Sequence, residues 1–94
     1  MYTLFELKEL IRFPKSLFTL KKWVKEIEKQ TEYRFRRLLV RKSGGLRMET
    51  ILVFSDDEVA LFEELLNLTE SEKLSLEQAV VCISEKFCLR GFEV

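Results

Sequence analysis

The sequence contains no histidine, one proline, two cysteines and three glycines among its 94 residues. Histidine is the commonest metal ligand and the usual general acid or base near neutral pH, so its absence excludes the most frequent metal sites and catalytic pairs. The scarcity of proline and glycine leaves little room for linkers or disordered segments. We therefore expect one small domain, with a length near the lower limit for a self-sufficient core.

The two cysteines, Cys82 and Cys88, lie six residues apart in one predicted helix. This spacing fits neither a disulfide framework nor a zinc motif. We interpret both as small apolar helix residues in a reducing cytoplasm, in preference to a redox or sensor role. The chain also lacks an apolar run of membrane-spanning length and an N-terminal signal-peptide pattern. The sequence thus predicts a cytoplasmic protein with no metal, no cofactor and no membrane association.

Charge is balanced over the whole chain but not along it. Residues 1–48 hold thirteen Lys and Arg against five Asp and Glu, a net charge of +8, whereas residues 49–94 hold three against eleven, a net charge of −8. This division indicates one surface for an anionic partner and a different surface for another task. The alternative is that the two halves neutralise each other across the fold.

The basic half opens with the pattern of two short helices. Thr3 and Glu6 form a capping box ahead of an apolar face over residues 4–11, and Pro14 ends that helix. A second helix is predicted over residues 16–29, with one apolar stripe at helical spacing. Lysines cover most of its remaining surface, namely Lys21, Lys22, Lys25 and Lys29.

A basic β-hairpin is predicted next. Residues 33–40 are rich in aromatic and branched side chains, and their alternation slips by one at Arg37, which indicates a β-bulge. Residues 41–45 form a basic turn in which the paired glycines supply positive φ angles, and residues 46–54 return as the second strand. This hairpin is the candidate wing.

The acidic half predicts two supporting helices, over about residues 56–68 and 76–88. Each follows a capping-box pattern, the first beginning at Ser55 and the second at Ser75. The predicted order is helix, helix, strand, strand, helix, helix. We therefore expect an α+β fold of the winged helix-turn-helix type, forming a single domain over residues 1–94, with the helix-turn-helix at about 3–29 and the wing at 33–54.

Four motifs in this order resemble the DNA-binding domain of the MerR family. The matching segments are Thr19-Leu20-Lys21-Lys22-Trp23, Tyr33-Arg34-Phe35, Phe54-Ser55-Asp56-Asp57-Glu58-Val59 and Leu74-Ser75-Leu76-Glu77-Gln78-Ala79. The likeness covers roughly residues 3–88. Departures include a longer hairpin, no glycine before Tyr33, no long C-terminal coiled-coil helix and no effector domain. The resemblance implies a minimal or divergent member, of the phage and plasmid accessory type, that binds duplex DNA without a small-molecule effector.

On this interpretation the helix over residues 16–29 enters the major groove, and the wing over residues 34–47 reaches flanking phosphates or the minor groove. The predicted DNA-binding residues are Lys15, Ser16, Thr19, Lys21, Lys22, Lys25, Arg34, Arg36, Arg37, Arg41, Lys42 and Arg47. The alternative for each lysine is an ordinary solvated helix face. Their concentration on one architectural motif favours DNA binding. Trp23 could stack on a base, but its position favours the core.

A transcription regulator is the expected role. A plasmid replication or partition factor, or an excisionase-like protein, would use the same surfaces. A rival of another class is a protein-interaction adaptor or inhibitor that uses the acidic, apolar C-terminal half. An enzyme is not expected, because the carboxylates and hydroxyls lie in capping positions and the cysteines lack a base partner. The predicted homodimer or partner surface consists of Phe87, Leu89, Phe92 and Val94.

Overall fold

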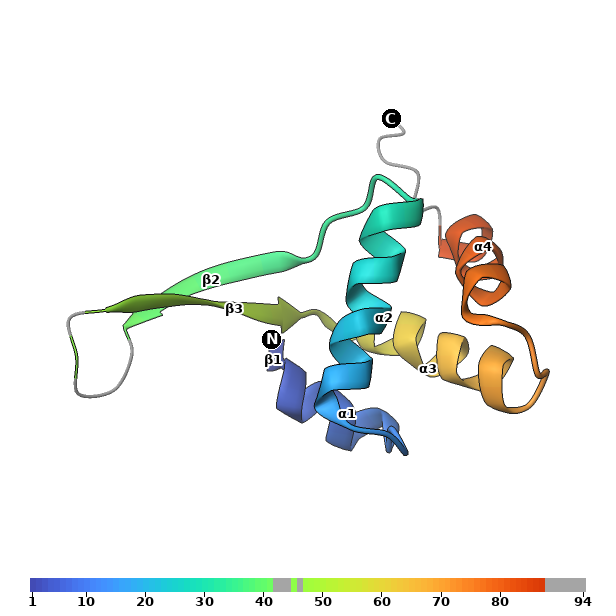
Figure 1. Cartoon of the computed structure of the whole chain (residues 1–94), viewed down its shortest axis with the longest axis horizontal. Helices are drawn as coiled ribbons and strands as arrows, with labels where there is room; N and C mark the ends of the chain where they lie inside the picture. The colour runs from blue at the N-terminus through green and yellow to red at the C-terminus, as the bar shows by residue number, and fades with distance from the viewer. Residues whose placement is uncertain (42–44, 46, 88–94) are drawn as a thin grey trace.

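The computed structural model describes residues 1–41, 45 and 47–87. Within these residues the chain forms a small α+β fold, with four helices gathered at one end of a three-stranded antiparallel sheet (Figure 1). The elements in chain order are β1 (Tyr2–Thr3), α1 (Leu4–Ile11), α2 (Leu17–Gln30), β2 (Arg36–Arg41), β3 (Met48–Phe54), α3 (Asp56–Glu70) and α4 (Leu76–Phe87). The predicted order was therefore incomplete, because it lacked β1.

Side-chain caps fix where the helices begin. At α1 the Thr3 hydroxyl accepts a hydrogen bond from the Glu6 amide, and the Glu6 carboxylate accepts one from the Thr3 amide. Ser55 and Glu58 repeat this reciprocal arrangement at α3, which confirms these two predicted capping boxes. At the far end of α1, Arg12 adopts a left-handed conformation with φ of 56° and closes the helix. Local sequence therefore sets these boundaries.

The hairpin departs from its prediction in two ways. Strand β2 begins at Arg36, and it pairs residue for residue with β3 from Arg36 opposite Val53 to Arg41 opposite Met48. The predicted bulge at Arg37 is therefore wrong. Leu38 and Leu39 point to opposite faces and both are exposed, so the slip in hydrophobic pattern reflects an outer hairpin with two solvent-facing sides.

The turn of the hairpin lies largely outside the described residues, including Lys42 and Gly44. Gly45 is described, and its φ is not in the left-handed range that the prediction assigned to both glycines. Among the described residues, an added Cβ there would meet the Arg47 amide nitrogen, at an ordinary 3.7 Å. The glycine at position 45 is therefore not required by its backbone conformation.

Strand β1 widens the base of the sheet. Its residues pair with the end of β3, Tyr2 opposite Phe54 and Thr3 opposite Val53, so that β3 is the central strand of the order β1–β3–β2. The outer part of the hairpin has no third strand among the described residues. It projects from the helical body along the longest axis of the molecule, which measures 44 Å (Figure 1).

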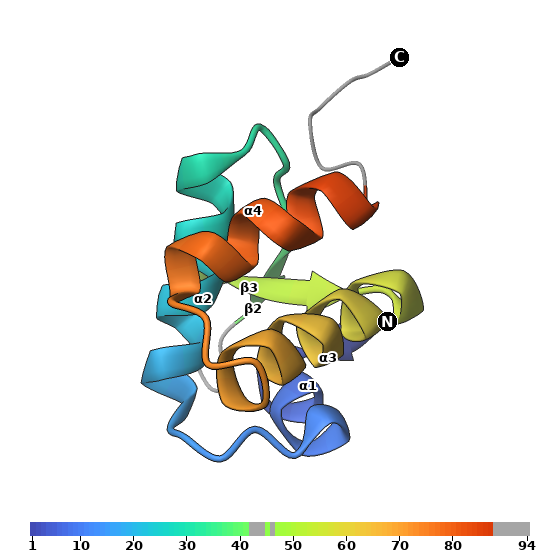
Figure 2. The same cartoon turned by 90° about the vertical axis from the view of Figure 1, so that its right-hand side faces the viewer.

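The core lies between the helices and the base of the sheet. Phe35, Phe54 and Phe62 form a buried aromatic cluster with ring centroids 5.5–5.6 Å apart. Phe13 and Trp23 meet edge to face at 4.8 Å, which confirms that Trp23 belongs to the core. Figure 2 shows α3 and α4 side by side on the side of the body away from the hairpin.

Two groups of residues predicted in the C-terminal half are only partly described. Cys82 lies on α4, as expected of a helix residue, and is exposed, whereas Cys88 is outside the described residues. Phe87 is partly buried against the core, while Leu89, Phe92 and Val94 also lie outside the described part. Among the residues described, no helix combines the length and the apolar character needed to cross a bilayer.

Candidate nucleic-acid interface

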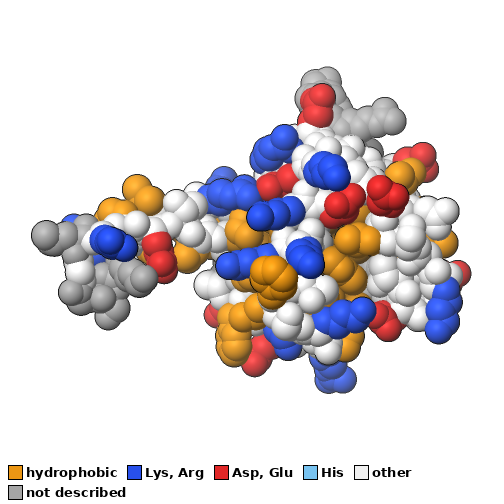
Figure 3. All heavy atoms as spheres, viewed as in Figure 1, with side chains coloured by type: hydrophobic (Ala, Val, Ile, Leu, Met, Phe, Trp, Pro, Cys, Tyr) orange, Lys and Arg blue, Asp and Glu red, His pale blue; other side chains and the backbone are white. Residues whose placement is uncertain are grey.

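Helix α2 presents one apolar and one cationic face. Its buried side is formed by Leu20, Trp23, Val24 and Ile27. Because an α-helix has 3.6 residues per turn, these four residues lie on one side of the helix, and the residues on the other side face water. The exposed cations on that outer face are Lys21, Lys22, Lys25 and Lys29. Figure 3 shows Lys and Arg side chains gathered over this part of the molecule, with hydrophobic side chains among them.

The start of α2 is fixed by two predicted DNA-binding residues. The Ser16 hydroxyl accepts a hydrogen bond from the Thr19 amide at 3.3 Å, as expected of an N-cap. The Thr19 hydroxyl lies 3.3 Å from the Ser16 hydroxyl and is half-buried. Lys15, immediately before the cap, is exposed. The serine and threonine thus stabilise the helix end, whereas Lys15 extends the cationic surface.

Phe18 is a surface residue that the sequence analysis missed. Its side chain is 68% exposed in the first turn of α2, and the Lys22 ammonium lies 5.0 Å from the centre of its ring. A cation over an exposed ring contributes roughly 0.5–1 kcal/mol. The signal was present in the spacing, because Phe18 precedes Lys22 by four residues and Lys25 by seven and so shares their face.

At the C-terminal end of α2, Glu28 ties the helix to the hairpin. Its carboxylate accepts two hydrogen bonds from the Arg37 guanidinium, at 2.9 and 3.0 Å, and one from the Phe35 amide at 2.9 Å. Partial burial alone would raise the pKa of Glu28. The hydrogen bonds from Arg37 and Phe35, with the nearby positive charges, outweigh burial and leave that pKa below its ordinary value. The contact fixes the direction in which β2 leaves the body.

Arg34 reinforces the same junction. One guanidinium nitrogen donates to the carbonyl oxygens of Glu28 at 2.8 Å, Tyr33 at 2.9 Å and Thr31 at 3.3 Å. It therefore satisfies carbonyl groups at and just after the end of the helix. Arg34 and Arg37, two of the predicted wing contacts, are thus engaged in holding the hairpin against α2.

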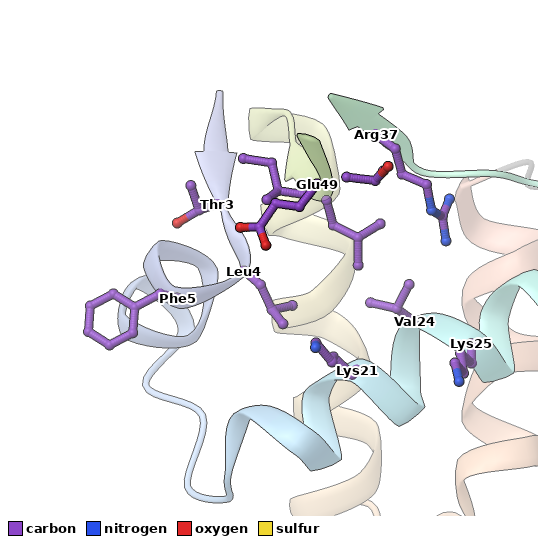
Figure 4. Close-up of a pocket in the computed structure, with 11 residues that line it drawn as sticks. Thr3, Leu4, Phe5, Lys21, Val24, Lys25, Arg37 and Glu49 are labelled. Carbon is purple, nitrogen blue, oxygen red and sulfur yellow. The ribbon is translucent and has the colours of Figure 1, made fainter. Parts of the chain in front are cut away.

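A groove of about 580 Å³ lies between α2 and the sheet. Lys21 and Val24 point into it from α2, and Arg37 reaches toward α2 from the opposite wall (Figure 4). The groove is also lined by Lys25, by residues 3–5 and by the β3 segment 49–52, with Glu49 as a carboxylate on the wall. The groove combines an apolar floor with cationic edges, which suits a sugar-phosphate strand, although Glu49 opposes a phosphate placed next to it.

The outer hairpin carries cations and exposed apolar side chains together. Arg36, Arg41 and Arg47 are exposed. The exposed apolar residues are Leu38 at 43%, Leu39 at 65% and Met48 at 48%. The predicted cationic wing therefore has an apolar component that the sequence analysis did not single out.

The two halves of the chain meet without an ion pair between them among the described residues. The ion pairs present are Arg37 with Glu28, inside the basic half, and Lys86 with Glu64, inside the acidic half. Two tyrosines bridge the halves instead: Tyr2 donates to Asp56 at 2.8 Å, and Tyr33 donates to the buried Glu58. Burial and the adjoining Glu58 carboxylate raise the pKa of Tyr33 well above its ordinary value.

The structure thus sorts the predicted residues into groups. Exposed cations lie on or beside α2 and on the hairpin, whereas Ser16, Thr19, Arg34 and Arg37 contribute to local structure. Lys42 lies outside the described residues. Within the described ranges, no group of three or more acidic or cysteine side chains is placed to hold a metal ion. In comparisons with known proteins, no family model, curated protein or solved structure matches the chain.

Proposed function

We propose that this chain binds duplex DNA as a winged helix-turn-helix protein that resembles the MerR DNA-binding domain. In this proposal α2 enters the major groove, and the β2–β3 hairpin lies along the neighbouring backbone. A transcription regulator is the role we favour. Replication, partition and excisionase-like roles would use the same two surfaces.

The observation that carries the proposal is the exposed cationic face of α2. Lys21, Lys22, Lys25 and Lys29 project from one helix whose opposite face is fixed in the core, and Lys15 stands at its start. Both ends of that helix are held, by the Ser16 cap and by the Glu28 junction. A rigid helix with cations on its outer face is suited to following a phosphate backbone at defined positions.

The placement of the hairpin adds support. The groove beside Lys21 separates α2 from the hairpin, so a helix in the major groove would leave one DNA strand facing this groove. Arg36, Arg41 and Arg47 are exposed along the arm that continues beyond it. The helix and the arm can therefore approach one polyanion from the same side.

The adaptor hypothesis has less support among the described residues. It requires an apolar surface on the acidic half, yet Val81 on α4, 52% exposed, is the only exposed large hydrophobic residue described in residues 49–94. The other exposed large hydrophobic residues lie on the basic half. The exposed apolar residues therefore lie in the same half of the chain as the cations, where they could contact the thymine methyl groups in the major groove.

The proposal is tested by fluorescence anisotropy on a random duplex and on the DNA that flanks the gene. If the chain makes about six phosphate contacts, raising the salt concentration from about 50 to 200 mM should weaken binding by ~10³-fold. Reversing the charge of Lys21 and Lys22, as K21E/K22E, should weaken binding by roughly 100-fold or more at low salt, because two attractions become repulsions.

The matched control is K73E/K86E, which makes the same change in net charge on the acidic half. Lys73 and Lys86 are both exposed, and the ion pair that Lys86 makes with Glu64 among the described residues is a 3.5 Å pair at the surface, so the variant should fold. Its DNA affinity should stay within a few-fold of the unchanged protein. Equal losses of DNA affinity in the two variants would show that net charge alone explains the effect. The absence of binding by the unchanged chain at low salt would contradict the proposal.

A further inference from the structure

The exposed ring of Phe18 lies outside the described hydrophobic core. Among the described residues it is the most exposed large hydrophobic side chain, although four other phenylalanines are buried in the core, at positions 13, 35, 54 and 62. The helix around it needs only its apolar stripe for packing. A single exposed apolar side chain is common on protein surfaces, so exposure alone does not assign Phe18 a contact. Its position does, because Phe18 shares the exposed face of α2 with Lys22 and Lys25.

The ring is held at a defined place. It lies in the first turn of α2, two residues after the Ser16 cap, where the backbone is fixed by the cap and by the buried stripe. A phenylalanine side chain has only two rotatable bonds, and the Lys22 ammonium lies 5.0 Å from the ring centre. Phe18 therefore presents an apolar surface beside a positive charge from a fixed position on the backbone.

Phe18 lies in the N-terminal part of α2, which would face the base edges in the proposed complex with DNA. In helix-turn-helix proteins the N-terminal residues of the recognition helix reach the major groove. A phenyl ring offers no donor or acceptor there. The C5-methyl group of thymine is the apolar group that the standard bases present in the major groove, and phenylalanine is suited to contact it.

We propose that Phe18 determines sequence specificity by contacting a thymine methyl group in the major groove, while Lys22 holds an adjoining phosphate. This inference rests on the proposed function and specifies thymine as the base that Phe18 recognises. It predicts a preference for thymine over every other base at one position of each site, caused by a methyl group and not by a hydrogen bond.

The test begins with duplexes selected from a random pool by the full chain. Each thymine of a selected duplex is then replaced by deoxyuridine, which removes the methyl group alone. At one thymine per bound protein, binding should weaken by about fourfold, the effect expected for one buried methyl group. The F18A variant should bind the thymine and uracil duplexes with equal affinity.

Two further variants separate the ring from its neighbours. F18L keeps an apolar side chain and should keep part of the discrimination, whereas K22M should bind more weakly with a salt slope smaller by about one and still discriminate. V81A, an equivalent truncation of an exposed residue on α4, should behave as the unchanged chain. Circular dichroism verifies that each variant is folded.

The outcomes distinguish this inference from the proposal beneath it. If the unchanged chain binds no duplex, both fail. If it binds duplexes and no thymine-to-uracil replacement changes the affinity, the proposed function stands and the role of Phe18 is overturned. That role is also overturned if F18A discriminates as well as the unchanged chain, or if its affinity falls equally for both duplexes.

Discussion

The two ends of the β2–β3 hairpin have the same strand pairing but opposite surroundings. At the base, Val53 and Phe54 are buried, β1 adds a third strand, and Phe35 packs beside them in the core. Toward the tip, Leu38 and Leu39 are exposed on opposite faces of a two-stranded ribbon. The base therefore belongs to the hydrophobic core, and the outer part is an arm.

This difference shows which part of the hairpin packs in the core and which part is left exposed to solvent. A two-stranded ribbon is marginally stable in water by itself, so the arm depends on its anchored base. The apolar residues of the arm contribute little to the free energy of folding, because they bury little area. Substitutions along the hairpin should therefore move the free energy of unfolding by amounts that fall from base to tip.

The largest effect is expected for F54A at the base. Phe54 has no exposed surface and contacts Phe35 and Phe62, so its truncation removes a large buried ring and leaves a cavity. The free energy of unfolding should fall by about 3–5 kcal/mol, a large part of the roughly 5–14 kcal/mol typical of a domain of this size. Urea unfolding followed by circular dichroism measures the change.

The same chemical change at an exposed position provides the control for F54A. F18A removes an equal ring from the surface of α2 and should change the free energy of unfolding by less than about 1 kcal/mol. Similar losses at the two positions would contradict the placement of Phe54 in the core and of Phe18 on the exposed surface.

A smaller effect is expected at the junction that joins the base of the hairpin to α2. E28Q replaces the carboxylate that accepts from Arg37 and from the Phe35 amide with a neutral amide, whose single oxygen is a weaker acceptor. We expect a loss of about 1–2 kcal/mol near neutral pH, given the partial exposure of the pair. Chemical unfolding at several pH values measures it.

The pH dependence gives this prediction its sign. The pKa of Glu28 is lower in the folded protein than its ordinary value of 4.5, so its contribution is fully present above pH 4.5. The contribution is lost as the pH falls through the folded pKa, and the gap between E28Q and the unchanged chain should close there. E32Q, at an exposed glutamate, should show little gap, and a gap for E28Q that persists at low pH would contradict the role of the charge.

Local signals in the sequence were sufficient for the helices. Capping residues and 3.6-residue periodicity depend on neighbours within a turn or two, and α1 occupies the predicted residues 4–11. The hairpin was harder to predict because alternation reports burial, and the outer arm is exposed on both sides. β1 was missed because a two-residue strand is too short to show a period, and its pairing with β3 joins residues about fifty positions apart.

The candidate site was predictable to the extent that it follows from α2. The apolar stripe determines which lysines face water, and the same spacing would have revealed Phe18. The hydrogen bonds of Arg34 and Arg37 to Glu28 were not predictable from the sequence. They depend on how the chain turns after Thr31 and brings both guanidinium groups to that residue. Charge type can be read from sequence, whereas the partner of each charge requires the fold.

The smallest effect on stability is expected at the arm, where L38T and L39T replace exposed leucines with a residue that favours strands. Each should change the free energy of unfolding by no more than about 0.5 kcal/mol. V53T, which places a hydroxyl in the buried base of the adjacent strand, should lower it by about 1–3 kcal/mol. A loss above about 1 kcal/mol at Leu39 would show that the arm packs as part of the fold. If L38T and L39T leave the free energy of unfolding unchanged and weaken DNA binding, the apolar residues of the arm contact the DNA and do not stabilise the fold.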